Sequence, residues 1–216
     1  MRAALCDEAL RLGRMLAQLL PDESEVHALL ALMELNASRT PARRGSNGEA
    51  VLLPEQDRSL WDDAQIQRGM TSLERARRLG GGAENYALQA AIAACHMRAR
   101  TAEETDWERI VLLYDALMQS APSPIVALNR AVAVGMAQGP AAGLAAVDAI
   151  ATPAADSALA CYHLLHSVRG DLLMKMGRFP EAREEIQRAM ALTQNLREQE
   201  LLTERLKQME KAAPST

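Results

Sequence analysis

The sequence predicts an all-α fold built from helical hairpins, and three observations support this class. Aromatic residues make up only 3% of the 216 residues, whereas Ala, Leu and Met are abundant, and these three side chains lose little conformational freedom in a helix. Capping residues and helix-breaking Gly and Pro divide the chain into segments of helical length. Small residues also recur at a regular spacing in the C-terminal half.

Two helices are expected first, over residues 2–20 and 23–38. Apolar side chains recur at helical spacing on one face of each: Leu5, Leu12, Met15, Leu16 and Leu19 in the first, and Val26, Leu29, Leu30, Met33 and Ala37 in the second. Residues 39–56 are turn-rich, and Asn47-Gly48 is typical of a tight turn. This segment predicts one short β-hairpin or ordered loop inserted near residues 42–54.

Helices are expected through most of the remaining chain. A helical stretch beginning at Asp57 or Ser59 ends at the glycine run of residues 80–82, which is a candidate hinge. Further helices are expected near residues 84–99, 103–120, 124–137, 140–151, 155–176, 179–193 and 196–211. We therefore expect an N-terminal helical part with the insertion (1–82), a repeat region (83–211) and a frayed tail (212–216), within one continuous structural unit.

The strongest pattern in the sequence is an internal repeat. The spacing of six positions matches the small-residue pattern of a tetratricopeptide repeat: Gly170, Leu173, Gly177, Ala182, Ile186 and Ala189. An earlier copy places Ala131 where Gly170 stands and Gly143 where Ala182 stands. Two helices of a hairpin need small residues where their axes cross, and such hairpins stack to share a core. The repeat thus predicts a tetratricopeptide-like helical-hairpin solenoid with a concave binding face.

Composition and charge narrow the functional classes. The formal net charge is −4 and the sequence lacks a basic stripe, so no direct contact with DNA is expected. No apolar run approaches the ~20 residues of a membrane span, and acidic residues appear too early for a signal peptide. Three cysteines are too few for a disulfide framework. These features predict a cytoplasmic protein.

No catalytic site, cofactor site or metal site is expected from the motifs. The glycine run of residues 80–82 lacks the Lys-Ser/Thr of a phosphate-binding loop, and no Ser-His or Cys-His arrangement has the supporting context of a catalytic site. Cys161, His163 and His166 are close in sequence, but the paired ligand spacings of zinc sites are absent. The alternative for these residues is packing at a helix interface.

Eight residues are candidate partner-binding positions: Gln56, Asp57, Arg58, Trp61, Asp106, Trp107, Asn129 and Arg130. Trp and Arg are favoured at binding hot spots, and a guanidinium can grip a carboxylate through two hydrogen bonds. Structural roles remain the alternative, with Asp57 as a helix cap, Trp61 as an anchor of the insertion and Asn129 as a bridge between helices.

Five sequence motifs, in order, resemble a known family. They are LAQLLPDESE at residues 16–25, LPEQDRSLW at 53–61, YALQAAIAA at 86–94, TDW at 105–107 with LYDAL at 113–117, and SPIVALNRAVA at 123–133. Together they resemble the C-terminal extension of one group of extracytoplasmic-function (ECF) RNA polymerase sigma factors. Members of that group carry a tetratricopeptide-like extension after the two sigma domains, and their genes commonly lie beside genes for YCII-related proteins.

The resemblance covers essentially the whole chain and implies a regulatory role. The promoter-melting domain and the helix-turn-helix domain of a sigma factor have no counterpart in these motifs, so the chain resembles an isolated extension. Such an extension is expected to contact the sigma core domains or RNA polymerase and to modulate transcription initiation. Two alternatives remain: a free-standing tetratricopeptide scaffold that binds a peptide unrelated to transcription, and an enzyme or small-ligand sensor that uses the central groove.

Overall fold

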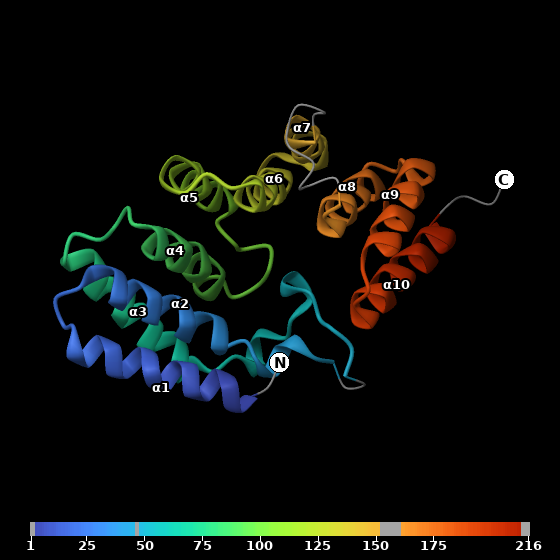
Figure 1. Cartoon of the computed structure of the whole chain (residues 1–216). Helices are drawn as coiled ribbons and strands as arrows, with labels where there is room; N and C mark the ends of the chain where they lie inside the picture. The colour runs from blue at the N-terminus through green and yellow to red at the C-terminus, as the bar shows by residue number, and fades with distance from the viewer. Residues whose placement is uncertain (1–2, 46–47, 152–160, 213–216) are drawn as a thin grey trace. The chain divides into compact units, whose positions relative to one another are not determined.

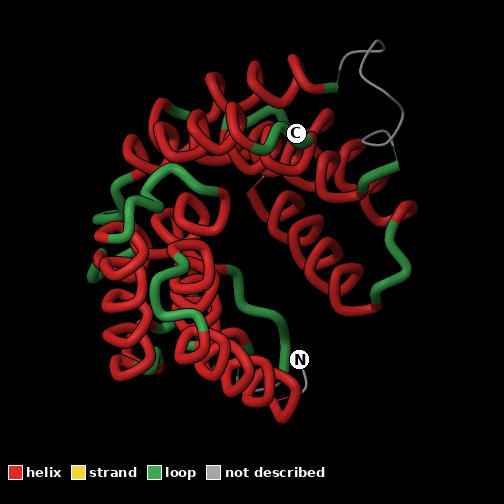
Figure 2. The backbone as a smooth tube through the Cα atoms, turned by 60° about the vertical axis from the view of Figure 1, so that its left-hand side comes forward, coloured by secondary structure: helices red, strands yellow, loops and turns green. Residues whose placement is uncertain are grey.

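The computed structural model describes residues 3–45, 48–151 and 161–212. These residues form α-helices joined by loops and short 3-10 turns, with no β-strand among them (Figure 2). The predicted all-α, helical-hairpin class is therefore confirmed. The described helices are α1 (Ala3–Leu19), α2 (Ser24–Ala37), α3 (Asp63–Arg78), α4 (Asn85–Arg98), α5 (Trp107–Ser120), α6 (Pro124–Gln138), α7 (Pro140–Ile150), α8 (His163–Lys175), α9 (Phe179–Leu192) and α10 (Leu196–Ala212).

The helices group into two compact units, Met1–Pro122 and Ser123–Thr216. The first unit contains α1 to α5 and the second contains α6 to α10. The glycine run of residues 80–82, where the sequence suggested a division, lies inside the first unit.

Helix α2 is the centre of the first unit, where it packs against α1, α3 and α4 (Figure 1). Its residues Ala28, Ala31 and Leu35 are completely buried, and the two alanines let neighbouring backbones approach closely. Helix α4 in turn packs against α5. A central helix covered on several sides accounts for the apolar character of α2 around much of its circumference.

The apolar residues predicted to share one face of α1 do share it, but that face is exposed. Leu12 is 52% exposed and Leu19 is 73% exposed, whereas Leu10 is only 4% exposed. Helix α1 packs against α2 through Leu10 and the small residues Gly13 and Ala17. Periodicity identifies faces of a helix, but the neighbouring helix decides which face is buried.

The insertion between α2 and α3 is an ordered loop, one of the two forms that the sequence left open. It contains three 3-10 turns, Pro41–Arg43, Leu53–Glu55 and Arg58–Leu60. A single antiparallel bridge joins Arg44 to Ala50, so the described part of the loop has no paired strands. Gly48 has a positive φ of 83°, as a tight turn requires, while Asn47 lies outside the described residues.

The second unit consists of the hairpins α6–α7 and α8–α9 followed by α10. The four positions predicted at helix crossings, Ala131, Gly143, Gly170 and Ala182, are all buried. A Cβ atom added to Gly143 would lie 2.6 Å from the Cα atom of Gly135, so α6 and α7 cross there in backbone contact. The helix expected from residue 155 is described only from His163, because residues 152–160 are outside the described part.

A hydrophobic core fills the second unit, with Leu173, Ile186 and Val147 among its most buried residues. No helix in the described part of the chain is both long and apolar enough to span a membrane.

Candidate interaction surfaces

The Arg58 guanidinium joins the insertion loop to the end of α4. Its Nη1 atom donates to the carbonyl oxygens of His96 (2.6 Å) and Ala99 (2.7 Å), and its Nη2 atom donates to Thr105 Oγ1 (3.4 Å). The last carbonyl groups of a helix have no partner within the helix, and a cationic side chain can satisfy them. Arg58 therefore acts as a C-terminal cap for α4.

The indole of Trp61 lies beneath this cap. The Arg58 guanidinium carbon is 4.7 Å from the centre of the Trp61 ring, a distance suited to a cation–π interaction. Trp61 is buried and belongs to a cluster with Leu35, Ile66 and Ala94. Trp61 thus anchors the loop to α2, α3 and α4.

The two candidate aspartates cap local structure. Asp57 Oδ1 accepts hydrogen bonds from the backbone N (2.9 Å) and the Oγ (2.7 Å) of Ser59, and these bonds lower the pKa of Asp57. Asp106 Oδ1 accepts a hydrogen bond from the backbone N of Arg109 (2.9 Å) and so caps the start of α5. Both residues are exposed, and each has a second carboxylate oxygen.

Trp107 meets the end of α4 from the α5 side. Its ring lies edge-on to the ring of His96, with the ring centres 5.2 Å apart. Burial, together with the nearby charges of Arg39 and Arg58, lowers the pKa of His96 to about 4. The imidazole is therefore neutral at neutral pH.

Gln56, the remaining candidate of the loop, is buried and donates from Nε2 to the carbonyl oxygen of Val51 (3.2 Å).

The structure thus brings four of the candidate residues, Arg58, Trp61, Asp106 and Trp107, to one place at the end of α4. Of the other four candidates, Gln56 and Asp57 make local hydrogen bonds within the insertion loop, and two are separate from this cluster. Asn129 and Arg130 lie on α6 in the second unit, where Asn129 is exposed and Arg130 is half-buried.

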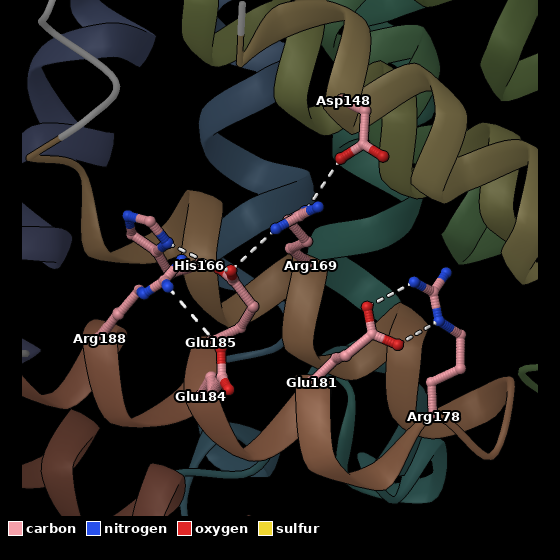
Figure 3. A network of polar contacts seen from close by, with 8 residues as sticks. All are labelled: Asp148, His166, Arg169, Arg178, Glu181, Glu184, Glu185 and Arg188. Atoms are coloured by element: carbon pink, nitrogen blue, oxygen red, sulfur yellow. Dashed lines mark hydrogen bonds and ion pairs between the residues drawn. The ribbon is translucent and has the colours of Figure 1, made fainter.

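A polar network that the sequence analysis missed joins α7, α8 and α9 (Figure 3). Its centre is the buried carboxylate of Glu185, which contacts His166 Nδ1 (2.7 Å), Arg169 Nη1 (2.8 Å) and Arg188 Nη1 (2.9 Å). Arg169 also donates from Nε to Asp148 Oδ1 on α7 (2.9 Å). The network therefore ties three helices of the second unit together.

A sequence signal for Glu185 did exist. It stands three residues after Ala182 and four before Ala189, a spacing that puts all three on one face of a helix. Both alanines are repeat positions predicted to be buried, and both are. An acidic residue on a buried face requires polar partners. His166 and Arg169 on the preceding helix are the polar residues that supply them.

The cysteine and histidine segment shows no metal-binding arrangement within the described part of the chain, where no group of three His, Cys, Asp or Glu side chains is placed to hold an ion. Cys161 is exposed. His163 Nε2 lies 2.8 Å from Glu198 Oε2, and His166 contacts Glu185. Both histidines therefore meet carboxylates of their own unit.

The first unit also contains a groove of about 770 Å³ between α1 and α3, which the sequence analysis did not anticipate. Ala17, Leu30 and Met70 supply apolar lining, of which Ala17 and Leu30 are buried. Residues along its edges include Arg14 from α1 and Arg75 and Arg78 from α3.

Comparisons with known proteins give relatives without an assigned activity. Residues 1–77 match a protein family of unknown function (DUF6596). The chain is 47% identical over 199 residues to uncharacterized protein R00370 of Rhizobium meliloti (strain 1021), and this alignment covers 91% of the chain and 45% of the relative. The chain thus spans somewhat less than half the length of that curated relative. No solved structure matches the chain.

Proposed function

We propose that the chain is a regulatory protein–protein interaction domain of an ECF-type sigma factor, which modulates transcription initiation by contacting the sigma core domains or RNA polymerase. The observation that carries this proposal is the ordered series of five motifs between residues 16 and 133. The domain acts by binding, without catalysis or a cofactor, and it works in the cytoplasm beside the polymerase.

The positions of the motifs in the first unit support a relationship at the level of the fold. Arg58 and Trp61 come from the motif at residues 53–61, and Arg58 bonds to Thr105 of the motif at residues 105–107. Trp61 packs against Ala94, the last residue of the motif at residues 86–94. Residues from three separate motifs therefore meet around the end of α4, as expected if the motifs preserve one shared architecture.

The length of the curated relative also supports the proposal. A sigma factor with such an extension is longer than the extension by at least two domains, and the relative extends well beyond the aligned part. We propose that the additional length of such relatives holds the promoter-recognition domains.

A second candidate function is a free-standing scaffold that binds a peptide unrelated to transcription. The groove between α1 and α3 favours it, because its apolar lining can accept side chains of any suitable partner. The two candidates differ in the identity of the partner rather than in the mode of action.

A retention experiment separates the two candidates. The tagged chain is incubated with core RNA polymerase and, separately, with the promoter-recognition domains of the cognate sigma factor. Retention of either is expected, and transcription in vitro by the full-length factor should change when this segment is removed. If neither is retained and transcription is unaffected by the removal, the sigma-factor proposal is wrong.

A further inference from the structure

We infer that the groove between α1 and α3 binds an acidic amphipathic helix, with apolar side chains of that helix in the groove and its carboxylates on the arginines at the edges. This inference deepens the proposed function and rests on it for the source of the helix, which would be the sigma core or the polymerase.

The arrangement of α1, α2 and α3 leaves room for a further helix. Helices α1 and α3 each pack against α2, and the groove runs between them with a volume of about 770 Å³. A helix placed there would complete a four-helix arrangement, the usual way in which an amphipathic helix buries its apolar face against others. The small side chain of Ala17 leaves space, and the flexible side chain of Met70 can adapt to an incoming residue.

The charges along the groove select an acidic partner. Arg14 lies on the α1 side, and Arg75 and Arg78 lie on the α3 side, whereas Glu74 is the one carboxylate among the described residues that line the groove. The protein as a whole has a net charge of −4, so the arginines along this groove are opposite in sign to the net charge of the protein. Guanidinium groups on both sides of an apolar channel match a helix with carboxylates flanking its apolar stripe.

Two of these arginines have internal partners that a ligand could replace. Arg75 Nη2 lies 3.2 Å from Asp22, whose side chain is 85% exposed. Arg78 Nε lies 3.0 Å from Glu74, whose side chain is 41% exposed. Exposed ion pairs of this kind contribute little to stability, so exchanging them for the carboxylates of a partner requires little free energy.

Arg14 is held more firmly than the other two. Its Nη2 atom lies 2.7 Å from a carboxylate oxygen of Glu34, a side chain that is only 1% exposed. The Nε atom of Arg68 lies 3.4 Å from the same oxygen. Glu34 therefore fixes Arg14 at the edge of the groove, while the Arg14 side chain itself remains 44% exposed. A cation held in place in this way loses less conformational entropy on binding.

A designed peptide tests the inference directly. The probe is a fluorescein-labelled peptide of about 18 residues, five helical turns, with Leu along one face and Glu at the flanking positions. A matched peptide has Lys in place of Glu. Fluorescence anisotropy with the whole chain should show saturable binding of the Glu peptide and much weaker binding of the Lys peptide. The double change Arg75→Glu and Arg78→Glu should weaken binding of the Glu peptide by about tenfold or more.

The matched control is Arg100→Glu, because Arg100 is exposed, pairs with Glu104 and is absent from the residues lining the groove. This variant should bind the Glu peptide as the original chain does. Circular dichroism confirms that each variant stays helical, as expected for exposed side chains. The inference is overturned if the Glu peptide does not bind saturably, if the Lys peptide binds equally well, or if the double change has no effect.

The same variants distinguish failure of this inference from failure of the proposed function. If the chain retains the sigma domains or polymerase and the Arg75→Glu, Arg78→Glu variant retains them equally, the regulatory function stands and the groove inference is wrong. If the Glu peptide binds with the expected dependence on the arginines but neither transcription partner is retained, the groove inference stands and the sigma-factor proposal fails.

Discussion

Arg58 and His96 are far apart in the sequence, yet the Arg58 Nη1 atom donates to the His96 carbonyl oxygen at 2.6 Å. The ring of His96 at the same time lies against Trp107 of α5. The insertion loop, the end of α4 and the start of α5 therefore meet at one residue. This junction decides how Arg58 and His96 should respond to mutation.

Replacing Arg58 with Ala should destabilise the first unit. The change leaves the carbonyl oxygens of His96 and Ala99 without their charged donor and removes the cation from the Trp61 ring. Hydrogen bonds to charged groups contribute about 1.5–3 kcal/mol, and we expect a loss within that range. Urea unfolding followed by circular dichroism measures it.

The control for Arg58 is Arg100→Ala, since Arg100 is highly exposed. Its change should alter the free energy of unfolding by no more than about 0.5 kcal/mol. An Arg58→Ala variant as stable as Arg100→Ala, but deficient in partner binding, would show that Arg58 serves the partner rather than the fold.

The buried ring of His96 should make stability depend on pH. Its pKa is about 4 in the folded chain, against a reference value of 6.5, so the unfolded chain takes up the proton first as the pH falls. The free energy of unfolding is therefore at its full value above about pH 6.5 and falls as the pH drops from 6.5 towards 4. With about 1.36 kcal/mol for each pKa unit, the loss is at most about 3 kcal/mol.

Unfolding of the original chain and of His96→Asn over this pH range isolates the effect. Other histidines contribute equally to both proteins, so the difference between the two curves belongs to position 96. That difference should change steadily between pH 6.5 and 4. Parallel curves would mean that His96 is accessible to protons in the folded chain.

The sequence predicted the helix boundaries well because capping and helix-breaking residues act on the backbone of their immediate neighbours. Ser123 Oγ accepts a hydrogen bond from the backbone N of Ile125 (3.3 Å), and α6 begins at Pro124 as expected. The positive φ of Gly139 (98°) ends α6 immediately before Pro140 starts α7. The small residue Gly143 identified a helix crossing, because a close approach of backbones requires a small residue, but its neighbour on α6 is Gly135 rather than the predicted Ala131.

Features that depend on distant neighbours were not predictable in the same way. The contacts of Arg58 with His96 and Ala99 need the loop to fold back across α4, which no spacing in the sequence encodes. The width of the groove beside Arg14 and Arg75 depends on the distance between α1 and α3, which both pack against α2. Such distances follow from packing of the whole unit rather than from any one segment.

Replacing a leucine with alanine should lower stability strongly on one face of α1 and hardly at all on the other. Leu10 is 4% exposed and lies on the side of α1 that packs against α2, whereas Leu12 is 52% exposed. Leu10→Ala should therefore cost about 2–5 kcal/mol, the usual range for a buried leucine. Leu12→Ala should change stability by no more than about 0.5 kcal/mol. Thermal and urea unfolding compare the two variants, and similar losses would mean that the exposed leucines are covered in solution.

Glu185 should matter far more than its neighbour Glu184. Glu185 is buried and contacts His166, Arg169 and Arg188, whereas Glu184 is 69% exposed and lies 3.8 Å from Arg188. Glu185→Ala should lower the free energy of unfolding by about 2–3 kcal/mol, because it leaves charged donors without their acceptor. Glu184→Ala serves as the adjacent control and should be nearly neutral. Equal effects would mean that the network does not stabilise the second unit.

Gly143→Ala tests the crossing of α6 and α7. Alanine normally stabilises a helix by about 1 kcal/mol relative to glycine. At Gly143, however, the new Cβ atom would lie 2.6 Å from the Cα atom of Gly135, and a backbone atom can move away only if the helices separate. Overpacking of this kind costs about 1–3 kcal/mol or more, so the net effect should be destabilising.

The control for this crossing is Gly13→Ala on α1, where the nearest atoms are Met33 Sδ (3.3 Å) and Leu30 Cδ1 (3.4 Å). These atoms end flexible side chains that can shift by a few tenths of an ångström, so the helical preference of alanine should be retained there. Thermal unfolding should therefore show a lowered melting temperature for Gly143→Ala and no comparable loss for Gly13→Ala. A stabilised Gly143→Ala variant would show that α6 and α7 do not cross in backbone contact, which removes the structural basis of the repeat in the second unit.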